Sequence, residues 1–116
     1  MMLPHPFPEQ ILLPNVLAVL GDPIRLAIVR ELARNAGEPM NCGRFLDFAS
    51  KTNVSYHLAK LREAGITHTE AVGTSRFTTL RRQELDARFP GLLDSVINAA
   101  VSDGALPSLE QADAEA

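Results

Sequence analysis

A chain of 116 residues has room for one domain with a modest core, which excludes a catalytic domain joined to a separate substrate domain. Hydrophobic residues make up 46% of the chain and charged residues 22%. This composition is typical of a globular protein and holds more apolar surface than a small monomer readily buries, which favours a dimer.

The charge of the chain is unevenly distributed, although the net value is -3 at pH 7. From residue 103 onward there are four acidic residues and no Lys or Arg. Between Arg44 and Arg82, seven basic residues outnumber three acidic ones, a local balance of +4. Because a partner meets the local field rather than the net charge, nucleic-acid binding is not excluded. We expect the basic excess to lie on the DNA-binding elements.

Cysteine usage and hydropathy indicate the compartment. The single cysteine, Cys42, excludes an internal disulfide and a structural zinc site made within one chain. Residues 1–8 contain no export signal, and no stretch approaches the ~20 apolar residues of a membrane span. We expect a cytoplasmic protein with no membrane partner and no cofactor.

The first part of the chain predicts an arm followed by two helices. Prolines are frequent in residues 1–13, which predicts an extended N-terminal arm that packs on a partner subunit. A domain then covers residues 14–102. Its first helix runs from Pro14 to a stop at Gly21, and Asp22 and Pro23 start a second helix that reaches about Asn35. Helical spacing predicts four buried residues in this second helix: Ile24, Ala27, Ile28 and Leu32.

The middle of the chain predicts a helix-turn-helix unit and a wing. A short helix is expected at about residues 42–48, followed by a tight connection into a helix that runs from Ser50 to Ala64 and stops at Gly65. Residues 67–72 and 76–80 are rich in Thr, Val and Phe and flank Gly73-Thr74-Ser75, which predicts a β-hairpin. The predicted fold is mainly α with a small β-hairpin, a winged helix-turn-helix.

The last part of the chain predicts a dimerisation helix and a tail. The helix runs from about Arg82 to Val101, and Pro90 breaks or kinks it. Its apolar face is too large for a helix on the outside of a small monomer, so we expect it to pair with its symmetry mate. That face contains Leu92, Leu93, Val96, Ile97 and Ala100. Residues 103–116 are small, polar and acidic, which predicts a flexible tail.

The helix that begins at Ser50 carries the candidate DNA-binding face. Ser50 is a good N-cap, and Val54, Leu58 and Leu61 share the face expected to point into the core. The opposite face carries hydroxyls, an aromatic ring, a small residue and cations, a surface suited to base edges and phosphates. Its residues are Lys51, Thr52, Ser55, Tyr56, Ala59 and Lys60.

Each of these assignments has a simpler alternative. For a single amphipathic helix, a solvated polar face is the better interpretation; here the preceding turn and the following hairpin favour DNA binding. His57 lies at the border between the two faces, where packing or hydrogen bonding is favoured over a phosphate contact. Arg76, beside the hairpin tip, is as well explained by an exposed strand residue as by a minor-groove or phosphate contact.

Two segments resemble the ArsR-type winged helix regulators of bacteria. Leu20 to Ile28, with the sequence LGDPIRLAI, looks like the family's entry motif into the second helix. Ser50 to Ile66, with the sequence SKTNVSYHLAKLREAGI, is similar to its recognition helix. The resemblance covers roughly residues 14–100. It implies a homodimer whose interface is formed by the first and last helices and which binds a palindromic operator with half-sites about one helical turn apart. It also implies a repressor that leaves DNA when an inducer binds.

This chain differs from the metal-sensing members of the family at the positions that bind the inducer. Metal-sensing members carry a cysteine pair before the recognition helix, where this chain has the single Cys42. Other members bind zinc in the last helix through His and carboxylates, and residues 82–101 contain no His. One thiol is a poor site for a soft metal. The resemblance therefore implies a member without a regulatory metal, and leaves open a small-molecule inducer such as a hydrophobic effector between the first and last helices.

Two other functions remain open. Cys42 is a candidate redox switch, against the simpler interpretation of a buried small residue at a helix start. The chain could also be a winged-helix protein-interaction module without DNA binding, which its overall acidity favours and its basic segment opposes. An enzyme is not expected, because the sequence shows no phosphate-binding loop and no nucleophile paired with a base at recognisable spacing.

Overall fold

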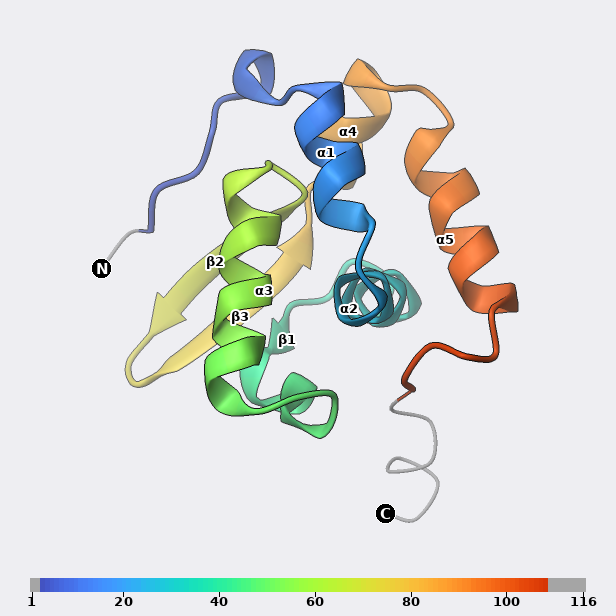
Figure 1. Cartoon of the computed structure of the whole chain (residues 1–116). Coiled ribbons are helices and arrows are strands. Elements are labelled where there is room, and N and C mark those ends of the chain that lie inside the picture. Colours follow the sequence, from blue (N-terminus) through green and yellow to red (C-terminus); the bar gives the residue numbers. More distant parts are fainter. Residues whose placement is uncertain (1–2, 109–116) are drawn as a thin grey trace.

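The computed structural model describes residues 3–108. The helices lie mainly on one side of a small antiparallel sheet with the strand order β1-β3-β2, and α3 lies in front of the β2–β3 hairpin (Figure 1). This arrangement is a winged helix, as predicted. The elements in chain order are η1 (Pro8–Gln10), α1 (Leu13–Leu20), α2 (Pro23–Arg34), β1 (Met40–Asn41), η2 (Cys42–Asp47), α3 (Lys51–Glu63), β2 (Thr67–Val72), β3 (Ser75–Leu80), α4 (Arg82–Arg88) and α5 (Leu92–Ser102).

The corner between α1 and α2 forms as predicted. Gly21 ends α1, and the Asp22 side chain accepts hydrogen bonds from the backbone N–H groups of Ile24 and Arg25, over 2.9 and 3.1 Å. Pro23 occupies the first helical position, where the missing N–H costs nothing. Of the four residues predicted to be buried in α2, three are buried and Ile24 is half-buried.

The helix-turn-helix unit differs from expectation in its first helix. Residues Cys42–Asp47 form a 3₁₀ helix, which begins where the Asn41 side chain accepts a hydrogen bond from Gly43 N–H over 2.9 Å. Short helical segments of this kind commonly adopt the 3₁₀ form. The segment is held in place by Phe45, whose side chain is completely buried. The Ser50 hydroxyl caps α3 by accepting from Asn53 N–H over 3.3 Å, as predicted.

The wing has a shorter turn than expected and a third strand. Ser75 belongs to β3 and pairs with Val72, so the turn contains only Gly73 and Thr74. β1 pairs with β3 through Met40 and Thr78. β1 was not predicted from the sequence, because two residues are too few to show an alternating pattern.

Pro90 divides the predicted last helix into α4 and α5, with Gly91 between them at a φ of +81°. Leu93, Ile97 and Ala100 of α5 are buried within the chain's own core. Most of the apolar face of α5 is therefore buried within a single chain, and the expectation that it is too large for a monomer was wrong for these residues.

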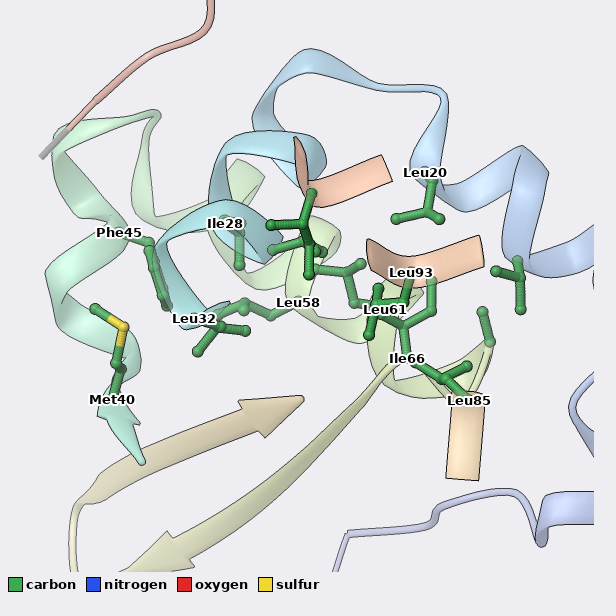
Figure 2. Packing of buried hydrophobic residues seen from close by; sticks show 14 of the residues in the cluster. Leu20, Ile28, Leu32, Met40, Phe45, Leu58, Leu61, Ile66, Leu85 and Leu93 are labelled. Atoms are coloured by element: carbon green, nitrogen blue, oxygen red, sulfur yellow. The ribbon is translucent and has the colours of Figure 1, made fainter. Parts of the chain in front are cut away.

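The core lies between the helices and the sheet (Figure 2). Leu58 and Leu61 of α3 and Ile28 of α2 meet Leu93 from α5 in one cluster of buried side chains. Phe45 and Met40 close the cluster beside the helix-turn-helix connection. This packing fixes the side of α3 that faces solvent. Among residues 3–108, no helix combines the length and apolar character required to span a bilayer.

The N-terminal arm packs against the sheet of its own chain. His5 Nε2 accepts a hydrogen bond from Thr69 N–H of β2 over 3.0 Å, and its ring stacks on His68 with centroids 4.1 Å apart. Arg81 donates to the Pro6 carbonyl over 2.8 Å. Ile11 is completely buried. The arm therefore covers the outer edge of the sheet and enters the core before α1 begins.

The first residues of the predicted tail also contact the folded domain. Arg30 of α2 donates a hydrogen bond to the Pro107 carbonyl, and Leu106 lies near α1 and α5. Residues 103–108 thus differ from the flexible segment that we expected. Residues 109–116 of that tail lie outside the described residues.

Candidate nucleic-acid interface

The two faces of α3 separate as the periodicity predicts. Val54, Leu58 and Leu61 point into the core, with exposed fractions of 3%, 9% and 0%. The opposite face is open to solvent over its first half and partly covered toward its end. Lys51, Thr52, Ser55 and Tyr56 are exposed, and Ala59 and Lys60 are half-buried.

Tyr56 stands at the centre of this face, between two cations. Lys60 Nζ lies 5.4 Å from the centroid of its ring and Arg25 Cζ lies 5.9 Å from it. Such contacts hold an exposed aromatic ring in a defined position. Lys60 Nζ also lies 4.0 Å from Glu63 Oε1, so part of its charge is already offset.

The wing and α3 enclose a groove of about 460 Å³. Lys51 and Ser55 line it from α3, and Thr74, Ser75 and Arg76 line it from the wing. The fold thus brings Arg76 to the same concave surface as two of the residues singled out on α3. Arg76 itself is exposed.

Arg25, which the sequence analysis did not include among the site residues, connects α2 to this face. Its Nε donates a hydrogen bond to His57 Nδ1 over 3.0 Å, and its Nη1 donates to the Val19 carbonyl over 3.1 Å. Asp22 Oδ1 lies 3.9 Å from the same His57 nitrogen. Arg25 belongs to the entry motif LGDPIRLAI, so the signal was in the sequence, but the contact spans 32 positions.

His57 is a packed, hydrogen-bonded residue, as favoured above. Its side chain is 13% exposed. A neutral imidazole that accepts at Nδ1 carries its proton on Nε2, so the bond from Arg25 selects one tautomer. Through this hydrogen bond, His57 links α3 to Arg25 of α2 next to Tyr56.

Not all of the basic residues between Arg44 and Arg82 lie on the interface. Arg81 binds Glu84 over 2.7 Å and has a side chain that is only 7% exposed, and Arg82 pairs with Asp94 of α5. These two residues support the arm and α5. The expectation that the basic excess lies on the DNA-binding elements was therefore wrong for them, because linear charge counts ignore which partners the fold supplies.

Cys42 lines the groove, yet its surroundings oppose reactivity. The side chain is half-buried, and burial raises the pKa of the thiol, an effect that Arg76 offsets only in part. A raised pKa reduces the thiolate fraction, and the thiolate is the nucleophile. This weighs against the redox alternative. In residues 3–108, no three side chains of His, Cys, Asp or Glu gather closely enough to hold a metal ion.

The described geometry agrees with what comparisons with known proteins find. A family model described as a helix-turn-helix domain matches residues 20–70, which run from the end of α1 into β2. YceK of Bacillus subtilis (strain 168), named as an uncharacterized HTH-type transcriptional regulator, is 34% identical over 84 residues, or 71% of this chain and 83% of the relative. The chain belongs to the HTH-type transcriptional regulators. As a member of this family it is a DNA-binding regulator, and α3 is the second helix of its helix-turn-helix unit.

Proposed function

We propose that the chain is an ArsR-type regulator that represses transcription by binding a specific operator as a homodimer. The groove between α3 and the wing is the observation that carries the proposal, because it brings hydroxyl and cationic side chains from two elements onto one concave surface. A second helix of this kind lies in the major groove while a wing follows the adjacent backbone. The proposed DNA contacts are Lys51, Thr52, Ser55, Tyr56, Lys60 and Arg76.

These residues divide by chemistry. Thr52, Ser55 and Tyr56 carry hydroxyls on the exposed first half of α3 and are proposed to contact base edges. Lys51, at the first turn of α3, and Lys60 are proposed to contact phosphates. Arg76 extends the surface along the wing toward a phosphate or the minor groove.

Exposed apolar residues support a homodimer. Leu12, Leu13 and Leu17 at α1 and Val101 on α5 are between 41% and 50% exposed. A second copy that packs its own α1 and α5 on this surface would bury them, and a two-fold dimer would place two copies of α3 on a palindromic operator. The homodimer is thus supported by these exposed residues and not by the residues of α5 that are buried within the chain.

A non-metal signal is proposed to release the repressor. Cys42 offers a single thiol with a raised pKa, and the chain lacks the cysteine pair of the metal-sensing members. The proposal therefore assigns release to a small molecule.

In vitro selection of binding sites from random duplex DNA tests the operator and the dimer together. The proposal predicts enrichment of an inverted repeat with half-sites about one helical turn apart. Sedimentation equilibrium should give twice the chain mass of 12.6 kDa. Enrichment of a single half-site by a concentration-independent monomer would contradict the homodimer, and no enrichment at all would contradict sequence-specific binding.

A further inference from the structure

The side of α3 opposite the wing carries a second set of cations. Ser55 lines the groove that the wing encloses, whereas His57, two positions later in the helix, faces Arg25 of α2. Lys60 follows Tyr56 by four residues and His57 by three, so helical spacing places it on the same flank as Arg25. In Figure 1 the hairpin tip and α2 accordingly lie on opposite sides of α3.

The guanidinium of Arg25 is held in a defined plane. Its Nε donates to His57 Nδ1 over 3.0 Å, and its Nη1 donates to the Val19 carbonyl over 3.1 Å. These two bonds also fix the position of the third nitrogen, Nη2, because the N–H groups of an arginine share one rigid plane. Among residues 3–108, no acceptor forms a hydrogen bond with Nη2. Arg25 therefore presents unused donors at a fixed place beside α3.

The charge of Arg25 is also uncompensated. Both of its acceptors are neutral groups, and within the described part of the chain no ion pair joins it to Asp or Glu. Asp22, at the N-cap of the same helix, is bound to two backbone N–H groups of α2. Arg81 and Arg82, by contrast, each bind a carboxylate. Arg25 thus combines a full positive charge with free donors, the properties with which arginine binds phosphate.

We propose that Arg25 binds a DNA phosphate through Nη2, on the side of the major groove opposite the wing. The inference rests on the proposed function, because it requires α3 to lie in that groove. A helix with a diameter of ~10–12 Å fills a major groove ~12 Å wide, so a row of phosphates runs along each of its sides. Arg76 meets one row from the wing, and Arg25 meets the other from α2.

The hydrogen bonds already present favour this contact. An arginine loses rotamer freedom when it is immobilised on a partner, and Arg25 has lost that freedom before DNA binds. Its guanidinium also lies beside the exposed ring of Tyr56, with Cζ 5.9 Å from the centroid. Phosphate contacts on both flanks fix the rotation of α3, which determines the side chains that face the bases. Arg25 therefore orients α3 from outside the helix-turn-helix unit.

A methylphosphonate scan of the operator selected from random DNA tests the contact. Each phosphate is replaced in turn by an uncharged methylphosphonate in both half-sites, and fluorescence anisotropy gives the affinity. The parent protein should lose about tenfold at one phosphate on the side away from the wing. Arg25→Gln should bind the unmodified duplex about tenfold more weakly and show no further loss at that phosphate, while it keeps the losses of the parent at all other positions.

Two further variants separate a direct contact from a change in folding. Arg88 of α4 also binds a backbone carbonyl and lies 5.5 Å from the ring of Phe89, so Arg88→Gln is the matched control and should show the complete pattern of the parent. Arg25→Lys should retain a loss of about threefold at the same phosphate, because its ammonium still attracts the phosphate without the fixed plane.

The scan distinguishes failure of the inference from failure of the proposed function. If Arg25→Gln weakens binding but stays as sensitive as the parent to every phosphate, Arg25 acts only by positioning His57, and the inference is overturned while the proposed function stands. A parent protein that binds no duplex would overturn both.

Discussion

Arg25 of α2 donates a hydrogen bond to His57 of α3 over 3.0 Å, and the same guanidinium binds the carbonyl of Val19 at the end of α1. One side chain therefore ties three helices together beneath the exposed Tyr56. Because Arg presents several donors in a fixed plane, no other residue type replaces it there without losing one of the contacts.

Replacing Arg25 with Ala should lower operator affinity about tenfold, because a hydrogen bond to a charged group is typically worth ~1.5–3 kcal/mol and its loss frees His57. The change should also alter the ¹⁵N chemical shifts of the His57 ring, since the imidazole loses the donor that selects its tautomer. Arg82→Ala is the matched control, because it removes the same charge from an exposed residue bound to Asp94 on α5. Equal losses in the two variants would show that only net charge matters.

Specificity should depend on the hydroxyls of α3. Ser55→Ala should change the preferred operator sequence at one position per half-site and reduce discrimination there by ~1–3 kcal/mol. Thr79→Ala, in the half-buried part of β3 away from the groove, is the control. Repeating the site selection with both variants checks the prediction, and an unchanged consensus for Ser55→Ala would remove Ser55 from the contacts.

Gly65 is required for two separable reasons. Its φ is +84°, and a Cβ at this position would lie 2.5 Å from Ile11 Cγ1. Gly91 has a similar φ of +81° with nothing within 4 Å. We therefore expect Gly91→Ala to cost about 1 kcal/mol of unfolding free energy, from backbone strain alone, and Gly65→Ala about 3 kcal/mol. Denaturant unfolding measures both, and equal costs would mean that Ile11 moves aside freely.

Stability should fall on mild acidification because of His5. Partial burial lowers the pKa of His5 below its usual 6.5, and the positive charges of His68, Arg62 and Arg81 lower it further. The unfolded chain then binds a proton more readily than the folded one, so the stability present above pH 6.5 is lost as pH falls toward the pKa of the folded state. Protonation also removes the acceptor for Thr69 N–H.

His5→Gln keeps an acceptor for Thr69 and does not titrate. Thermal unfolding between about pH 8 and pH 5.5 should therefore show a smaller decline for this variant than for the parent. Glu84 does not interfere, because hydrogen bonds from Arg81 lower its pKa and it stays ionised throughout this range. Parallel curves for the two proteins would exclude His5 as the source.

Features with a local cause were predictable from the sequence. Asp22 and Ser50 cap their helices through groups two or three residues away, and Gly65 ends α3 through its own backbone. The inward face of α3 follows from helical spacing alone, which placed Val54 correctly. Each of these depends on interactions within one helical turn.

Features that depend on distant partners were not predictable. β1 exists because Met40 meets Thr78, and the bond between Arg25 and His57 joins residues 32 positions apart. The basic residues Arg81 and Arg82 looked available in the sequence until the fold supplied the Pro6 carbonyl for Arg81 and the Asp94 carboxylate for Arg82. Tertiary pairing determines each of these outcomes.

The salt dependence of operator binding tests the central claim, that the face formed by α3 and the wing binds DNA, most directly. Fluorescence anisotropy with the DNA upstream of the gene should show affinity falling at least about tenfold between ~50 and ~200 mM salt, because bound phosphates release counterions. Lys51→Ala should bind more weakly and reduce the slope by about one, while Arg82→Ala leaves the slope unchanged. Binding that is absent, or that is equally salt-dependent in the parent and Lys51→Ala proteins, would contradict the claim.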